Sequence, residues 1–132
     1  MPSVFTQIIN RKIPAHILAE DERYIAFLDV SPLAQGHTLV IPKAEVDYIF
    51  NMEDELLSGL MIFAKKVAKG IERSVECKRI GIAVIGLEVP HAHIHLIPLQ
   101  NIEDINFSRT KLNVTVEDLA EMAKKIIKNL NR

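Results

Sequence analysis

Three histidines at alternate positions, His91, His93 and His95, are the residues of this sequence with the clearest potential for chemistry. Successive side chains of a strand point to opposite faces, so this spacing predicts three imidazoles on one face and the intervening apolar residues on the other. Pro90 and Pro98 bracket the segment, which fits a short strand because proline is tolerated at strand ends. Imidazole acts as base, acid, nucleophile or metal ligand near neutral pH. The segment therefore predicts a reactive face on a strand.

Two kinds of chemistry fit this histidine face. Alternate histidines of a strand can bind zinc, but the backbones of His91 and His95 would lie roughly 13 Å apart, so a metal site would need His93, one neighbour and a remote residue such as His37. In phosphoryl transfer, one imidazole attacks phosphorus while its neighbours donate hydrogen bonds to the phosphate oxygens. A purely structural role would require a partner for each buried ring. The spacing by itself leaves these readings open.

The elements that position the histidines follow from the hydrophobic pattern. Across residues 53–73 apolar side chains repeat at three and four residues, with acidic residues first and basic residues last, which predicts a long amphipathic helix. Thr115 offers the cap of another helix in the C-terminal extension, residues 101–132. We expect a short helix over 4–13, ended by Pro14, and strands over 16–20, 24–28, 37–42, 79–86 and the histidine motif. This order predicts one α+β domain over residues 1–132 with a mixed, mainly antiparallel sheet.

Composition excludes several classes of function. The chain has 16 basic and 17 acidic residues, a formal charge of −1, so no net field attracts a nucleic acid. No apolar run approaches the ~20 residues that span a bilayer, and a membrane role is not expected. The single cysteine, Cys77, forms no intramolecular disulfide, and the amino terminus lacks a signal pattern, so the cytoplasm is the expected compartment.

Several blocks of this sequence resemble one known family in order and spacing. His-Ala-His-Ile-His-Leu-Ile at 91–97 matches the histidine-triad (HIT) motif, and the Hint branch of that nucleotide-binding, phosphoramidase-like family is also similar at three upstream blocks. These are 4–15, then Ala-Phe-Leu-Asp-Val-Ser-Pro at 26–32, then Gly-His-Thr-Leu-Val-Ile-Pro-Lys at 36–43. The resemblance implies a HIT-like fold, a homodimer, a purine nucleotide of the AMP or GMP kind as ligand, and no cofactor or metal.

The resemblance also implies roles for individual residues. His93 would be the nucleophile, His95 would bind the phosphate, and His91 and His37 would orient or polarise this group. Asp29 would accept hydrogen bonds from the ribose, although its place before Ser31-Pro32 also fits an Asx turn. The remaining positions expected at the nucleotide are Val30 beside Asp29, Phe5, Ile8, Ile13, Phe27 and Leu28 around the base, and Glu88 and Val89 in the preceding loop.

The implied reaction is hydrolysis of a nucleoside 5'-phosphoramidate or a related adenylated compound through a covalent nucleotidyl-histidine. A neighbouring acid would protonate the departing amine, and water would then release the nucleotide. Two alternatives stay open: a nucleotide-binding regulatory module with little turnover, and a metal-dependent phosphohydrolase.

The sequence departs from the Hint branch in three places. The loop 86–90 is shorter than that of the family, and Glu88 stands where the family has a small hydroxyl, so a carboxylate there repels phosphate unless it is protonated, paired or turned away. Glu45 replaces another family histidine. In the C-terminal extension, Ser108 or Arg109 is a candidate to replace the lost phosphate contacts.

Overall fold

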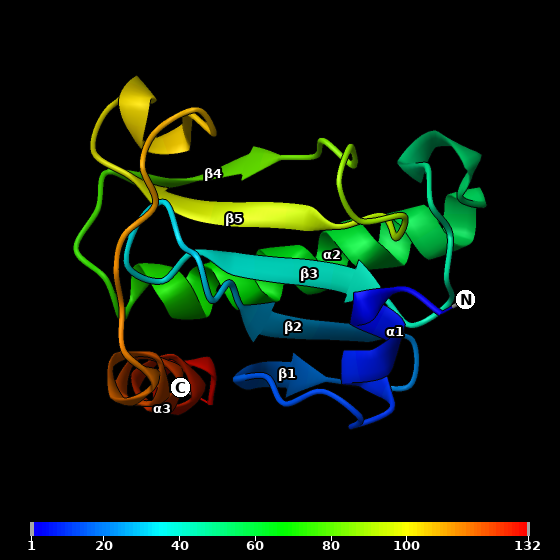
Figure 1. The fold of residues 1–132 in the computed structure, drawn as a ribbon, viewed down its shortest axis with the longest axis horizontal. Helices are drawn as coiled ribbons and strands as arrows, with labels where there is room; N and C mark the ends of the chain where they lie inside the picture. The colour runs from blue at the N-terminus through cyan, green and yellow to red at the C-terminus, as the bar shows by residue number, and fades with distance from the viewer. Residues whose placement is uncertain (1, 132) are drawn as a thin grey trace.

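A five-stranded sheet forms the centre of the molecule, with strand order β1-β2-β3-β5-β4 (Figure 1). The computed structural model describes residues 2–131. The strands are β1 (Ile17–Glu20), β2 (Tyr24–Leu28), β3 (Thr38–Pro42), β4 (Arg79–Ala83) and β5 (Ile94–Leu99). Every pairing among them is antiparallel, so the α+β class is confirmed while the described sheet is antiparallel throughout rather than mixed.

Three α-helices and two short 3-10 helices complete the fold: α1 (Val4–Ile9), η1 (Ile49–Asn51), α2 (Asp54–Glu72), η2 (Ile102–Ile105) and α3 (Val116–Leu130). The long helix and the Thr115 cap are confirmed, since Asp118 N–H donates to the Thr115 hydroxyl at the start of α3. The predicted first helix is shorter than expected. It ends at Ile9 because Arg11 adopts a left-handed φ of 61°, which a helix cannot continue.

The two faces of the sheet carry separate cores. Ala26, Leu28, Val40, Ile94 and Leu96 pack in the larger cluster with residues of α2 and α3. On the opposite face, a smaller cluster joins α1 to the central strands, and its buried members are Phe5, Ile8, Ile25, Phe27, Leu39 and Ile41. The apolar residues between the histidines belong to the α2 side, so the predicted division of faces is confirmed.

The histidine motif is less regular than the predicted strand. β5 begins only at Ile94, and the Ala92 N–H donates to the Val46 carbonyl (2.7 Å), outside the sheet. His91 and His93 therefore precede the strand, and only His95 lies in it. Pro98 lies inside β5 rather than after it; β3 pairs with β5 only as far as Leu96, so one side of Pro98 has no strand to receive an N–H.

Two connections reach the α1 face of the sheet. β4 ends at Ala83 rather than at residue 86, and the following loop contains Gly86, whose φ of 74° favours glycine. Residues 106–115, which we call the strap, lead from η2 past the sheet to α3 (the orange trace in Figure 1). The Leu112 N–H donates to the Pro32 carbonyl (2.8 Å), which holds the strap against the loop after β2. Within the described residues, the helices are too short or too polar to cross a membrane.

Candidate active site

A pocket of about 360 Å³ opens on the α1 face of the sheet, between α1, the β4–β5 loop and the strap. Seven residues that the sequence nominated line it together: Phe5, Asp29, His37, Glu88, Val89, His93 and His95. They come from α1, the loop after β2, the residue before β3, the loop before the motif and the motif itself. The register of β3 against β5 places Leu39 opposite His95 and so brings His37 next to the motif.

Six other nominated residues do not line this pocket. Ile8, Ile13 and Phe27 lie in or against the smaller core cluster, where the Phe27 ring supports Phe5 edge-on (centroids 5.5 Å apart). Leu28 points to the α2 core, because its neighbour Phe27 takes the other face of β2. Val30 is 64% exposed, and the His91 ring is buried against Ser3 and Phe5.

His93 is held in one protonation pattern by the main chain. Its Nδ1 lies 2.7 Å from the His91 carbonyl oxygen. A carbonyl only accepts, so Nδ1 carries the proton and Nε2 of the neutral ring keeps its lone pair. The ring lines the pocket, and Phe5 packs edge-on against it with centroids 4.9 Å apart. The geometry therefore offers a nucleophilic nitrogen whose ring orientation is fixed from both sides.

The His91 ring does not line the pocket, and the residue contacts His93 through its main-chain carbonyl. Its Nε2–H donates to the Pro42 carbonyl (2.8 Å), and its Nδ1 accepts from the Ser3 hydroxyl (2.9 Å). Both ring nitrogens are thus engaged away from the pocket. Burial lowers the pKa of His91, although the bond to Pro42 opposes this shift. The ring anchors the segment whose carbonyl orients His93.

Ser3 and Glu45 dock α1 onto this anchor. Ser3 caps α1, and one Glu45 carboxylate oxygen accepts from the Ser3 N–H (2.7 Å) and the Thr6 hydroxyl (2.6 Å). Glu45 is therefore a carboxylate that docks the helix onto the sheet. The docking holds Phe5 against His93.

His37 and His95 form a directed hydrogen-bond chain. The Leu33 N–H donates to His37 Nδ1 (3.0 Å), so the proton of a neutral His37 sits on Nε2, which lies 3.0 Å from His95 Nδ1. His95 must then carry its own proton on Nε2, where it can donate to a ligand. Burial is the main cause that lowers the pKa of His37 to about 3 and that of His95 to about 4. Both rings are neutral near pH 7.

Asp29 forms the Asx turn and also lines the pocket. One carboxylate oxygen accepts from the Ser31 N–H (2.8 Å), which is an Asx turn. The other lies 3.6 Å from His37 Nε2, and the side chain is 20% exposed in the pocket wall. Burial raises the pKa of this carboxyl. The second oxygen is available to accept hydrogen bonds from a ligand.

Asp29, His37 and His95 also bring three potential metal-ligating atoms within 4.8 Å of one another. This set differs from the one predicted, since His93 is not in it. The proton between His37 and His95 occupies the space between the two nitrogens, so a cation would have to displace it.

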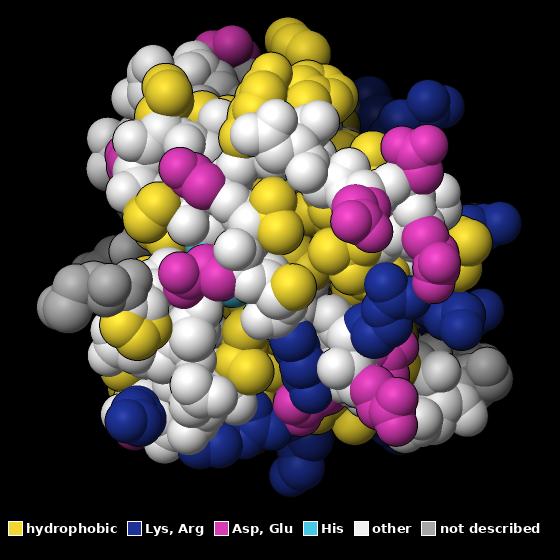
Figure 2. Space-filling view, turned by 90° about the vertical axis from the view of Figure 1, so that its right-hand side faces the viewer, with side chains coloured by type: hydrophobic (Ala, Val, Ile, Leu, Met, Phe, Trp, Pro, Cys, Tyr) yellow, Lys and Arg dark blue, Asp and Glu magenta, His cyan; other side chains and the backbone are white. Residues whose placement is uncertain are grey.

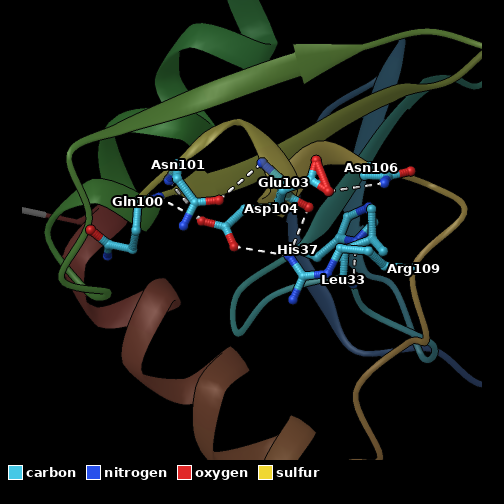
Figure 3. Close-up of polar contacts among 8 residues, drawn as sticks. All are labelled: Leu33, His37, Gln100, Asn101, Glu103, Asp104, Asn106 and Arg109. Carbon is cyan, nitrogen blue, oxygen red and sulfur yellow. Dashed lines mark hydrogen bonds and ion pairs between the residues drawn. The ribbon is translucent and has the colours of Figure 1, made fainter.

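The sequence missed several residues that line the pocket: Ser31, Leu39, Ile85, Leu87, Phe107 and Lys111. The two C-terminal candidates were the wrong ones. Arg109 reaches back to the Glu103 carbonyl (2.7 Å) and to Asp104 (3.1 Å), as Figure 3 shows, while Ser108 is exposed outside the pocket. Their neighbours Phe107 and Lys111 face the pocket, and only the path of the strap reveals this.

One family model and several known proteins resemble this chain. The HIT domain model matches residues 10–102. An uncharacterized HIT-like protein of Borreliella burgdorferi is 35% identical across 96% of this chain and 97% of its own. The adenosine 5'-monophosphoramidase HNT1 of Saccharomyces cerevisiae is 36% identical across 72% of this chain and 61% of its own. A crystal structure of a Hit-like protein from Bartonella henselae, involved in cell-cycle regulation, has a TM-score of 0.83 at 30% identity, covering 96% of this chain and 95% of that chain.

Proposed function

Because this chain belongs to the HIT domain family, we propose that it binds a purine nucleotide and hydrolyses nucleoside 5'-phosphoramidates or related adenylated compounds through a nucleotidyl-His93 intermediate. The observation that carries the proposal is the bond from His93 Nδ1–H to the His91 carbonyl, which leaves Nε2 ready to attack. The similarity to a yeast adenosine 5'-monophosphoramidase supports the reaction class.

The reaction proceeds in two displacements at the α-phosphorus. His93 Nε2 attacks, the phosphorus–nitrogen bond of the substrate breaks, and the amine departs with that electron pair and takes up one proton. The ring becomes a cation, which the His91 carbonyl stabilises through Nδ1–H. Water then attacks phosphorus, the bond to Nε2 breaks, one proton is released, and the nucleoside monophosphate leaves.

The other pocket residues bind the nucleotide around this centre. His95 Nε2–H donates to a phosphate oxygen, and the chain from Leu33 through His37 fixes its direction. The second Asp29 oxygen accepts from the ribose hydroxyls. Phe5 and Val89 offer apolar contacts to the base.

Capture of the intermediate tests this function. The protein is mixed with adenosine 5'-phosphoramidate, quenched in denaturant at alkaline pH, and weighed intact. We expect one adenylyl group per chain, which peptide mapping assigns to His93. Tight binding of AMP without adduct or turnover would instead identify a regulatory nucleotide-binding module.

The cluster of Asp29, His37 and His95 favours one competing function, a metal-dependent phosphohydrolase. Treatment with a chelator distinguishes this metal-dependent mechanism from the proposed covalent mechanism. If the covalent mechanism holds, the protein keeps full activity after dialysis against EDTA, because no step uses a cation. Activity that disappears with EDTA and returns with zinc contradicts it.

Glu88 is expected to select the leaving group. Its carboxylate lines the same pocket as His93 and is expected to repel an anionic leaving group. We expect Glu88→Gln to raise kcat/KM for a phosphoramidate of glycine about fivefold, the effect of roughly 1 kcal/mol of exposed charge repulsion, while the value for unsubstituted phosphoramidate changes less than twofold. Steady-state kinetics with both substrates measures this, and equal changes for both would contradict the assignment.

We propose that the chain forms a homodimer through the free edge of β4 and the neighbouring apolar surface. β4 is the last strand of the sheet, and Ile82 on it is 51% exposed. Tyr48, Phe50, Met61 and Val84 continue this surface; Phe50 is 76% exposed. Figure 2 views this end of the molecule, with hydrophobic side chains gathered over its upper part. Such an edge favours pairing with a second copy.

Phe50→Glu should shift this dimer to monomer, because it places a charge on the apolar surface. Sedimentation velocity at micromolar concentration measures the change. Val116→Glu is the matched control, since Val116 is 69% exposed on α3, away from this surface. A wild-type monomer, or a dimer that Phe50→Glu leaves intact, contradicts the proposed surface.

A further inference from the structure

The strap closes one side of the pocket with an aromatic ring. The Phe107 ring lies edge-on to His95, with centroids 4.7 Å apart at 69°, and its centroid is 6.2 Å from that of His37. It thereby covers one side of the His37–His95 pair.

The strap is fixed at two points. Arg109, between Phe107 and Lys111, bonds to η2, and the Leu112 N–H donates to the Pro32 carbonyl (2.8 Å). Pro32 lies in the loop that begins at Asp29. Lys111 is therefore held beside the pocket wall that carries Asp29, and its ammonium donates to the Phe107 carbonyl (3.1 Å).

Few positively charged side chains line the pocket to bind a phosphate. Asp29 and Glu88 contribute carboxylates, and burial keeps His37 and His95 neutral near pH 7. Among the described residues that line this pocket, Lys111 is the one lysine or arginine. Its charge adds to the lowering of the pKa of His37 and His95, and it opposes the rise that burial causes in the pKa of Asp29.

The ammonium has capacity for a ligand. A lysine donates three hydrogen bonds, and within residues 2–131 the Phe107 carbonyl is the single acceptor that Lys111 meets, with no carboxylate at ion-pair distance. The Phe107 ring, 6.0 Å from Nζ, supports the cation on one side. Two N–H groups remain for phosphate oxygens.

We propose that Lys111 binds the phosphate of the nucleotide in this pocket, so that the C-terminal strap supplies the positive charge that the neutral histidines and the short loop 86–90 lack. This inference rests on the proposed nucleotide site and extends it. Phe107 and Lys111 both lie beyond residue 102, where the match to the HIT domain ends. The strap therefore brings to the phosphate site a positive charge from outside the matched domain, and it selects a nucleotide over a nucleoside.

Equilibrium binding of AMP and adenosine tests the role without any turnover. We expect Lys111→Met to weaken AMP binding about tenfold, as the loss of one charge-assisted hydrogen bond does, and to leave adenosine binding within twofold. Lys111→Arg should keep AMP affinity within threefold. The affinity of the wild type for AMP should fall with added salt more steeply than that of Lys111→Met. Lys66→Met on the exposed face of α2 is the matched control.

The outcomes separate this inference from the function on which it rests. AMP binding that Lys111→Met leaves unchanged overturns the phosphate role and leaves the nucleotide site standing. Equal losses for AMP and adenosine also overturn it, because they indicate that Lys111 merely supports the strap. A wild-type protein that binds neither ligand overturns both proposals.

Discussion

Replacement of His93 by alanine is expected to lower kcat/KM for adenosine 5'-phosphoramidate by at least about a thousandfold and to abolish the adenylyl adduct. The side chain supplies the attacking nitrogen, and no other ring can take its place. His95 is committed through Nδ1 to His37, and both nitrogens of His91 are engaged with Ser3 and Pro42. Stopped-flow and intact-mass measurements on the same samples give the rate and the adduct.

Two further measurements make this prediction specific. AMP affinity of His93→Ala should stay within about fivefold of wild type, since an exposed or shared hydrogen bond contributes about 1 kcal/mol. His16→Ala, a histidine outside the pocket, should keep wild-type activity. An adduct that persists in His93→Ala, or one that maps to His95, would show that the nucleophile is misassigned.

Acid is expected to destabilise the fold before its carboxylates titrate. His37 and His95 have ordinary pKa values near 6.5 in the unfolded chain, and the fold lowers them to about 3 and about 4. Between these values the unfolded chain binds more protons, so the free energy of unfolding falls as pH drops below 6.5 and stops falling near the folded pKa. Each of the two rings should lower the free energy of unfolding by about 2 kcal/mol between pH 7 and pH 5.

Urea unfolding at pH 7, 6 and 5 measures this loss. His91, whose pKa is also lowered, adds to it, while Asp29, whose pKa is raised, acts in the opposite direction. The glutamine side chain of His37→Gln keeps a donor toward His95 but does not titrate. The variant should therefore lose about 2 kcal/mol less free energy of unfolding than the wild type between pH 7 and pH 5. His16→Gln is the control. Equal slopes for wild type and His37→Gln contradict the neutral, buried pair.

Much of the fold could be predicted because it depends on neighbours in one element. The division of apolar and histidine faces around Ile94 follows from the alternation of a strand, and Thr115 caps α3 by bonding three residues ahead. The ends of α1 and β5 differ from those that the sequence pattern predicts. α1 ends early at a left-handed Arg11, and β5 starts late because Ala92 bonds to Val46, a residue of a distant loop.

The sequence alone determined which side chains could do chemistry: the motif histidines, with Asp29 and His37 upstream. Only the tertiary structure decided their roles. The His91 carbonyl sets the proton on His93, and His37 meets His95 across 58 positions because β3 pairs beside β5. The strap brings Lys111 into the pocket from beyond the motif. The physical reason is that residue type and spacing act within one element, whereas protonation and charge balance depend on atoms that separate elements bring within hydrogen-bond distance.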